Sequence, residues 1–135
     1  MAENKPKIVV IDDSATSISL YRRSAKVLQV DLAAFQSPLE SLDYLRENGA
    51  DLVFLDILMG EKDGWLVLRE MRAFELHQDT AVIIVTSKDY DQDRALAKNL
   101  GAHRYLVKPL RSQEIRDISC EFTGVEPVAD DETDL

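Results

Sequence analysis

The chain has 135 residues, a length typical of one domain, and 45% of them are hydrophobic, enough to form a substantial core. Sixteen basic against 25 acidic residues give a formal net charge of −9, which disfavours direct binding to nucleic acid or to an anionic membrane surface. A single cysteine excludes an internal disulfide, and neither a transmembrane segment nor a signal peptide is recognisable, so we expect a cytoplasmic protein.

Five short apolar runs predict β-strands. Four of them are clear and the second along the chain is weaker; they cover residues 8–11, 32–35, 52–55, 81–85 and 105–107. Polar and apolar residues do not alternate within these runs, which is typical of strands covered by helices on both faces of a sheet. The pattern therefore favours a parallel sheet.

Helical patterns fill the intervals between the predicted strands. They start at Ser14, at Ser37, near Trp65, at Tyr90 and at Ser112, and Gly101 closes the fourth. Ser14 and Ser37 are the expected N-caps, and the first helix is expected to run to about Leu28. This alternation predicts an α/β fold with a doubly wound, five-stranded parallel sheet over residues 1–123. Residues 124–135 are expected to form a disordered acidic tail.

Polar residues follow four of the five predicted strands, at the points where the strands end. They are Asp12 and Asp13 after the first run, Asp56 after the third, Thr86 and Ser87 after the fourth, and Lys108 and Pro109 after the fifth. Ligands of open α/β sheets bind outside the carboxyl ends of the strands. These side chains are therefore the candidate functional site.

The residue types in this candidate site favour phosphoryl chemistry. Three carboxylates at one edge repel each other and need a compensating cation, of which Lys108 supplies only one charge. Oxygen ligands without histidine or cysteine favour Mg²⁺, which completes its shell with water and phosphate oxygens. Asp56 stands alone after its strand and is the candidate nucleophile, while Asp12 and Asp13 are candidate metal ligands. Thr86 and Lys108 are expected to hold phosphoryl oxygens.

Four motifs in this order resemble the receiver domain of bacterial two-component response regulators, the CheY-like family. They are Ile-Asp-Asp-Ser at 11–14, Phe-Leu-Asp-Ile-Leu-Met-Gly-Glu-Lys-Asp-Gly at 54–64, Ile-Val-Thr-Ser at 84–87 and Tyr-Leu-Val-Lys-Pro at 105–109. The resemblance extends from about Lys7 to Phe122. It implies a flavodoxin-like (βα)5 fold and an apparently stand-alone receiver, because too few residues follow for an output domain.

The resemblance also implies a role for each site residue. Asp56 is the implied phosphoacceptor. Mg²⁺ would be held by Asp13 and Asp56 directly, by Asp12 largely through water, and by the backbone carbonyl of Leu58. The implied phosphoryl-binding and switch residues are Thr86, Ser87, Lys108 and Tyr105, with a cis peptide bond before Pro109. Gly60 departs from the family pattern, which usually has proline there.

The implied partners are proteins. A sensor histidine kinase or a histidine phosphotransfer protein would supply the phosphoryl group, and small acyl phosphates could replace them. Output would be a changed contact through the face made by the fourth helix, the fifth strand and the fifth helix, in a monomer or a phosphorylation-dependent dimer. Such a protein is a switch rather than an enzyme, since it catalyses only its own phosphoryl transfer and dephosphorylation.

Two other functions compete with this one. A metal-dependent phosphatase with an aspartate nucleophile would require an Asp-x-Asp pair, which residues 11–14 lack. A receiver that is never phosphorylated could act as a scaffold, although all the key side chains are present. Nucleotide binding is disfavoured because no glycine-rich phosphate loop follows a strand.

Several residues have two interpretations. Arg22, Arg23 and Lys26 form a basic patch on the first helix, either a solvated surface or a contact for the kinase. The acidic tail is either solubilising or the start of a linker or partner motif. His77 and His103 lack ligand spacing, and both are expected to be solvated.

Overall fold

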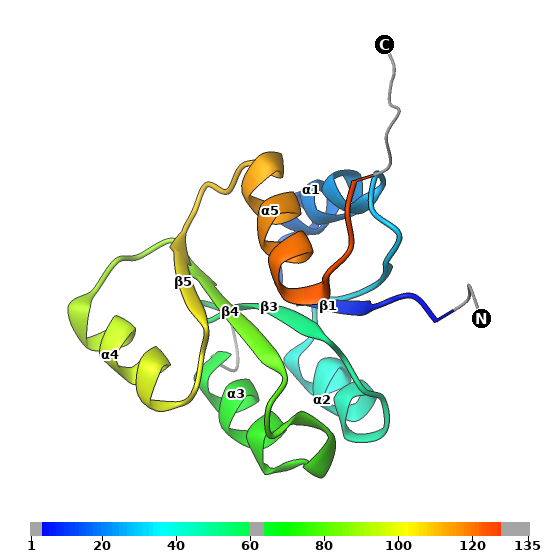
Figure 1. Ribbon diagram of the computed structural model, residues 1–135. Helices are drawn as coiled ribbons and strands as arrows, with labels where there is room; N and C mark the ends of the chain where they lie inside the picture. Colours follow the sequence, from blue (N-terminus) through cyan, green and yellow to red (C-terminus); the bar gives the residue numbers. More distant parts are fainter. Residues whose placement is uncertain (1–3, 60–63, 128–135) are drawn as a thin grey trace.

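Five parallel strands form one sheet in the order β2-β1-β3-β4-β5, with helices in the connections between them (Figure 1). The computed structural model describes residues 4–59 and 64–127. The strands are β1 (Lys7–Ile11), β2 (Asp31–Phe35), β3 (Leu52–Asp56), β4 (Ala81–Thr86) and β5 (Arg104–Val107). The helices are α1 (Ala15–Ala25), α2 (Pro38–Glu47), α3 (Gly64–Ala73), α4 (Asp91–Asn99) and α5 (Ser112–Thr123). The predicted doubly wound parallel sheet is confirmed.

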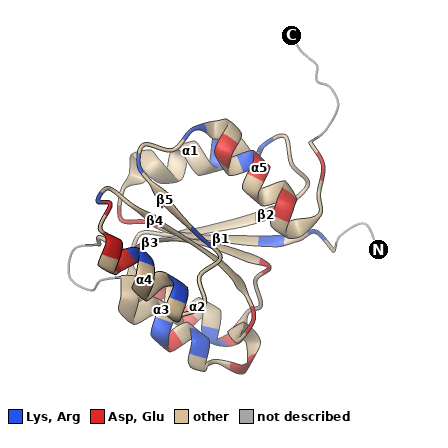
Figure 2. Cartoon of the chain, turned by 60° about the vertical axis from the view of Figure 1, so that its left-hand side comes forward, with Lys and Arg blue, Asp and Glu red and all other residues tan. Residues whose placement is uncertain are grey.

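The helices cover both faces of the sheet. Helices α1 and α5 pack on one face, and α2, α3 and α4 pack on the other (Figures 1 and 2). Strands β1, β3 and β4 are central, and almost all of their residues are buried, because each face lies under a helix layer. No helix among the described residues is long and apolar enough to cross a membrane.

The edge position of β2 explains why its sequence signal is weak. It pairs with β1 alone, and four of its five residues are only half-buried, so it carries alanines where the central strands carry Val, Ile and Leu. Strand β5 forms the other edge and also has no fully buried residue. An edge strand needs less apolar surface than a central one, and its apolar run is correspondingly less distinct.

The predicted helix caps are confirmed. The Ser14 hydroxyl accepts a hydrogen bond from the Ser17 amide at the start of α1, and Ser37 accepts one from Glu40 at the start of α2. Helix α1 ends at Ala25, three residues before the predicted end at Leu28. A turn follows, in which the Lys26 and Leu28 amides donate to the carbonyls of Arg23 and Ala25. The helix is therefore shorter than predicted.

The prediction that His77 is solvated was wrong. A short 3₁₀ helix, η1 (Glu75–His77), turns its imidazole into the protein, where it is fully buried. Nε2 lies 2.8 Å from the Leu45 carbonyl oxygen and 2.9 Å from that of Asn48, and Nδ1 lies 2.9 Å from Thr80 Oγ1. The ring therefore caps the end of α2, whose last carbonyls have no partner within the helix. His103, by contrast, is exposed as predicted.

Replacing His77 with alanine is expected to destabilise the protein by about 2–4 kcal/mol, because it opens a cavity and leaves buried carbonyls without a donor. Urea unfolding followed by circular dichroism measures the difference. Gln78→Ala is the matched control, since its side chain is exposed on the next residue, and we expect less than about 0.5 kcal/mol there. Equal midpoints for the two variants would show that the imidazole contributes no net stability.

Candidate functional site

The site lies at the carboxyl edge of the sheet, where the chain direction places four of the predicted residues. Asp12 follows β1, Asp56 ends β3, Thr86 ends β4 and Lys108 follows β5. Strand β1 pairs with β2 on one side and β3 on the other, so the connections diverge there and leave a crevice above the sheet. The strand order therefore brings together residues that are up to 96 positions apart in the sequence.

Three carboxylates meet in this crevice. One oxygen from each of Asp12, Asp13 and Asp56 lies within 4.8 Å of the others. Asp12 and Asp56 are buried, with 1% and 4% of their surface exposed, whereas Asp13 is exposed. Turn amides orient the two buried groups: Ser14 donates to Asp12 Oδ1 at 2.9 Å, and Leu58 donates to Asp56 Oδ1 at 2.8 Å.

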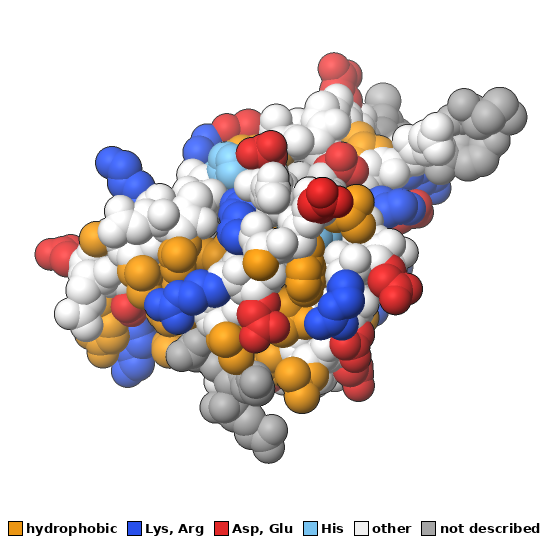
Figure 3. All heavy atoms as spheres, turned by 90° about the horizontal axis from the view of Figure 1, so that it is seen from below, with side chains coloured by type: hydrophobic (Ala, Val, Ile, Leu, Met, Phe, Trp, Pro, Cys, Tyr) orange, Lys and Arg blue, Asp and Glu red, His pale blue; other side chains and the backbone are white. Residues whose placement is uncertain are grey.

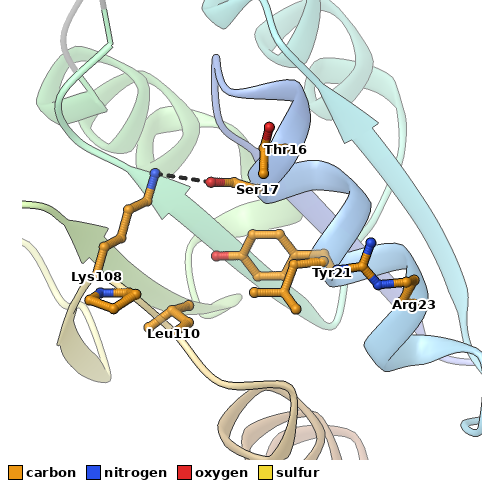
Figure 4. Close-up of a pocket in the computed structure, with 8 residues that line it drawn as sticks. Thr16, Ser17, Tyr21, Arg23, Lys108 and Leu110 are labelled. Atoms are coloured by element: carbon orange, nitrogen blue, oxygen red, sulfur yellow. Dashed lines mark hydrogen bonds between the residues drawn. The ribbon is translucent and has the colours of Figure 1, made fainter.

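Lys108 is the cation of the site. Its Nζ lies 2.9 Å from Asp12 Oδ2 and 3.1 Å from Asp56 Oδ2, and it also reaches Ser17 Oγ at 3.4 Å (Figure 4). Burial alone would lower the pKa of Lys108, but the neighbouring carboxylates of Asp12 and Asp56 outweigh it and raise that pKa. The ammonium therefore stays charged at neutral pH.

The donor set fits a divalent cation bound by oxygen. Three carboxylates face one ammonium, so two negative charges remain unbalanced at the site. Asp12 Oδ2 is buried and accepts no hydrogen bond in the described part of the chain, although the ammonium lies beside it. Burial, with the charge of Asp12, raises the pKa of Asp56 despite the hydrogen bond from Leu58. A cation that binds these oxygens would relieve each of these costs.

Thr86 and Tyr105 are connected through one residue of the β4–α4 loop. The buried Thr86 hydroxyl accepts a hydrogen bond from the Lys88 amide at 3.1 Å, and the Tyr105 hydroxyl donates to the Lys88 carbonyl at 3.0 Å. The Arg94 guanidinium lies 4.6 Å from the centre of the Tyr105 ring and forms an ion pair with Asp89 at 2.7 Å. The loop therefore links the floor of the site to the surface of α4 and β5.

Sequence reasoning missed the role of Gly64, the first residue of α3. A Cβ at this position would lie 2.5 Å from the Asp56 carbonyl oxygen and 2.6 Å from Ile57 Cα, closer than any real contact. The Gly64 amide donates to the Ile57 carbonyl at 3.1 Å. Only glycine lets α3 start against the strand that carries Asp56, and the Asp-Gly pair at 63–64 is the one sequence signal for this approach.

The other predicted site residues differ in how closely they approach the carboxylates. The Leu58 side chain is 46% exposed at the mouth of the site, and Ser87 is exposed on the β4–α4 loop. The peptide bond between Lys108 and Pro109 is cis. Gly60, the departure from the family motif, lies outside the described residues. The contact of Ser17 with Lys108 and the backbone link that Lys88 makes between Thr86 and Tyr105 were not anticipated.

Comparison with known proteins identifies the family. A model described as the response regulator receiver domain matches residues 8–119. A CheY-like receiver from Methanospirillum hungatei JF-1 is similar with a TM-score of 0.80 and 18% identity, over 87% of this chain and 93% of that one. The phosphorylated cyanobacterial phytochrome response regulator RcpA is similar with a TM-score of 0.78 and 21% identity, over 87% and 94%.

A third similar structure is the receiver domain of a sensor histidine kinase from Pseudomonas aeruginosa PAO1, which holds a magnesium ion in its active-site cleft. Its TM-score is 0.78 at 20% identity, over 89% of this chain and 98% of that one. At these identities the solved structures establish the fold alone. The family model covers most of the chain, and the acidic cluster fits the phosphorylation site of such domains. The chain belongs to the response regulator receiver domain family.

Proposed function

We propose that Asp56 accepts a phosphoryl group in a Mg²⁺-dependent reaction and that this change switches the contacts of the protein. The observation that carries the proposal is the position of the Asp56 carboxylate, which is 4% exposed, 3.1 Å from Lys108 and grouped with two further carboxylates. Relatives solved in phosphorylated and in magnesium-bound forms support the same assignment.

The carboxylates would hold Mg²⁺ together with the backbone carbonyl of Leu58. Asp13 and Asp56 are the proposed direct ligands, and Asp12 acts largely through water. When bound, Mg²⁺ neutralises charge on the transferring phosphoryl oxygens. The Leu58 amide fixes the carboxylate of Asp56, as the Ser14 amide fixes that of Asp12. Asp56 is the proposed nucleophile because it ends the middle strand of the sheet, with carboxylates on one side and Thr86 and Lys108 on the other.

In the proposed transfer, an Asp56 oxygen forms a bond to phosphorus while the bond from phosphorus to the donor breaks. The donor is a phosphohistidine nitrogen or the acyl oxygen of a small acyl phosphate, and this leaving atom keeps the electron pair. Lys108 already contacts Asp56 Oδ2, so its ammonium is in position to bind a phosphoryl oxygen. The Thr86 hydroxyl, with Ser87 beside it, is the second proposed partner of the phosphoryl group.

Output would pass through the loop that joins Thr86 to Tyr105. A Thr86 hydroxyl that turns to the phosphoryl group gives up its bond to the Lys88 amide, and Lys88 is also the acceptor for Tyr105. The loop and the tyrosine then rearrange together on the surface made by α4, β5 and α5. A sensor histidine kinase or histidine phosphotransfer protein is the proposed donor, and a protein that reads this surface is the proposed target.

The proposed function has consequences for the cellular location, the oligomeric state and the domain boundaries of the protein. We propose a cytoplasmic protein, since its one cysteine has no partner for an internal disulfide. A monomer that dimerises on phosphorylation would use the same surface of α4, β5 and α5. We further propose residues 1–123 as the receiver domain and 124–135 as a separate acidic tail.

The deciding experiment is intact-mass spectrometry after incubation with acetyl phosphate and Mg²⁺. We expect a gain of one phosphoryl group, which is lost in Asp56→Asn and when EDTA replaces Mg²⁺. Asp43→Asn, an exposed carboxylate on α2, is the matched control and should still be phosphorylated. A folded protein that gains no phosphoryl group would support the scaffold function, and release of phosphate from an ester substrate would support a phosphatase.

A further inference from the structure

Helix α1 carries a concentration of positive charge that is unusual in this acidic protein. Residues 14–30 contain three basic residues, Arg22, Arg23 and Lys26, and no acidic one, although the whole chain has a net charge of −9. All three side chains are exposed, and none forms an ion pair with any other described residue. By contrast, acidic and basic side chains are interspersed on the face covered by α2, α3 and α4 (Figure 3).

A cavity of about 450 Å³ lies beside this basic patch, between α1 and the segment that joins β5 to α5 (Figure 4). Leu20, Tyr21 and Leu110 supply apolar wall, and Arg23 and Lys108 contribute cations from the two sides. A ligand that fits this arrangement is apolar in part and negatively charged. We call the cavity and the three basic side chains together the α1 surface.

The tail of the chain has the complementary chemistry. Residues 125–135 contain five acidic residues and no basic one, and the apolar Val128, Ala129 and Leu135 lie among the acids. Five negative charges therefore follow α5 directly, against three unpaired positive charges on α1. Charges of this density attract each other over about 10 Å at moderate ionic strength.

The fold also places the start of the tail near the basic patch. Helices α1 and α5 pack on the same face of the sheet, and each begins at the carboxyl edge and ends at the opposite edge (Figure 1). Arg22 and Arg23 lie in the last turn of α1, and α5 ends at Thr123 with Gly124 as a left-handed cap. The eight residues after Pro127 can span about 26 Å, whereas the eleven residues of α1 span about 16 Å.

We propose that the acidic tail, residues 126–135, docks on the α1 surface of its own chain. Its carboxylates bind Arg22, Arg23 and Lys26, and its apolar residues enter the cavity beside Lys108. Each exposed ion pair contributes little alone. The short connection to α5 nevertheless gives the tail an effective concentration on the order of millimolar, so weak contacts suffice to keep it bound.

Amide chemical shifts of ¹⁵N-labelled protein at low salt test the proposal. We expect removal of residues 128–135 to shift the amides of 20–26, 110 and 111; every described helix and strand lies before the truncation. In an Arg22→Gln, Arg23→Gln background the same truncation should give shifts at least threefold smaller. The matched control is Arg69→Gln, Lys98→Gln on the other face, which removes equal charge and should keep the full shifts.

Two further measurements identify the segment that binds the α1 surface and the contribution of charge to this binding. A synthetic peptide of residues 125–135 added to the truncated chain should shift the same amides, and 0.5 M NaCl should reduce these shifts severalfold. The proposal fails if truncation leaves α1 unchanged, or if the shifts persist in the Arg22, Arg23 background or map to α4 instead. Shifts that grow with protein concentration would assign the tail to a second copy and would equally overturn intramolecular docking.

Discussion

Gly64→Ala is expected to destabilise the protein by about 3 kcal/mol, the upper part of the range for overpacking in a rigid interior. The new Cβ would lie 2.5 Å from the Asp56 carbonyl oxygen and 2.6 Å from Ile57 Cα. Asp56 pairs with Val85 of β4, and the Ile57 amide donates to the Val85 carbonyl, so this backbone cannot move without disturbing hydrogen bonds at the edge of the sheet. The start of α3 must move instead, which weakens its packing under the sheet.

Urea unfolding measures this effect, and Gly49→Ala provides the matched control. A Cβ at Gly49 meets no atom within 4 Å, so the substitution there should change stability by less than about 0.5 kcal/mol. We also expect Gly64→Ala to slow phosphorylation of Asp56, because a displaced α3 moves the turn that orients the carboxylate. Equal stabilities for the two alanine variants would mean that α3 does not approach β3 as closely as described.

The arrangement of the site could be predicted because it depends on local patterns and on one rule of topology. Apolar runs identify the ends of β1, β3, β4 and β5, and parallel strands bring those ends to one edge of the sheet. Asp12, Asp56 and Lys108 follow such runs in the sequence, and the Lys108 ammonium lies within 3.1 Å of an oxygen of each aspartate. No detail of packing is needed for this inference.

The residues that sequence reasoning missed are those whose roles depend on distant backbone. The imidazole of His77 caps a helix that ended some 30 residues earlier. It binds backbone carbonyls, which every residue type has, so the sequence at those positions does not reveal the contact. Lys88 connects Thr86 to Tyr105 through its own amide and carbonyl, which any residue possesses. Backbone contacts of this kind leave no pattern in a single sequence, whereas strand ends do.

In EDTA at neutral pH, Asp56→Asn is expected to stabilise the protein by about 1–2 kcal/mol, although it removes an ion pair. At an effective dielectric constant of about 20, each of the two neighbouring carboxylates repels Asp56 by roughly 3 kcal/mol, and Lys108 attracts it by about 5 kcal/mol. Burial adds a desolvation cost, which is the main reason that the pKa of Asp56 is raised. Amide substitution removes both the repulsion and that cost while keeping the shape of the side chain.

The pH and Mg²⁺ dependence of this difference distinguishes charge relief from a general packing effect. Because the pKa of Asp56 is raised in the folded state, the unfolded chain loses its proton first, near the ordinary value of 3.8. The stability of the wild type relative to the variant therefore falls as the pH rises from about 4 to the folded pKa, and it is constant above that. The variant should have no advantage below pH 4. Thermal unfolding across this range, in EDTA, measures the difference.

Mg²⁺ should then reverse the order of the two proteins. A ligand at one hundred times its dissociation constant stabilises the folded state by about 2.7 kcal/mol, which exceeds the advantage expected for the variant in EDTA. The wild type offers three carboxylates and the variant two, so the wild type gains more from the same concentration. NaCl at equal ionic strength controls for screening of the cluster. An advantage of the variant that is independent of both pH and Mg²⁺ would show that Asp56 carries no unbalanced charge in the folded protein, and would remove the electrostatic reason for a cation at this site.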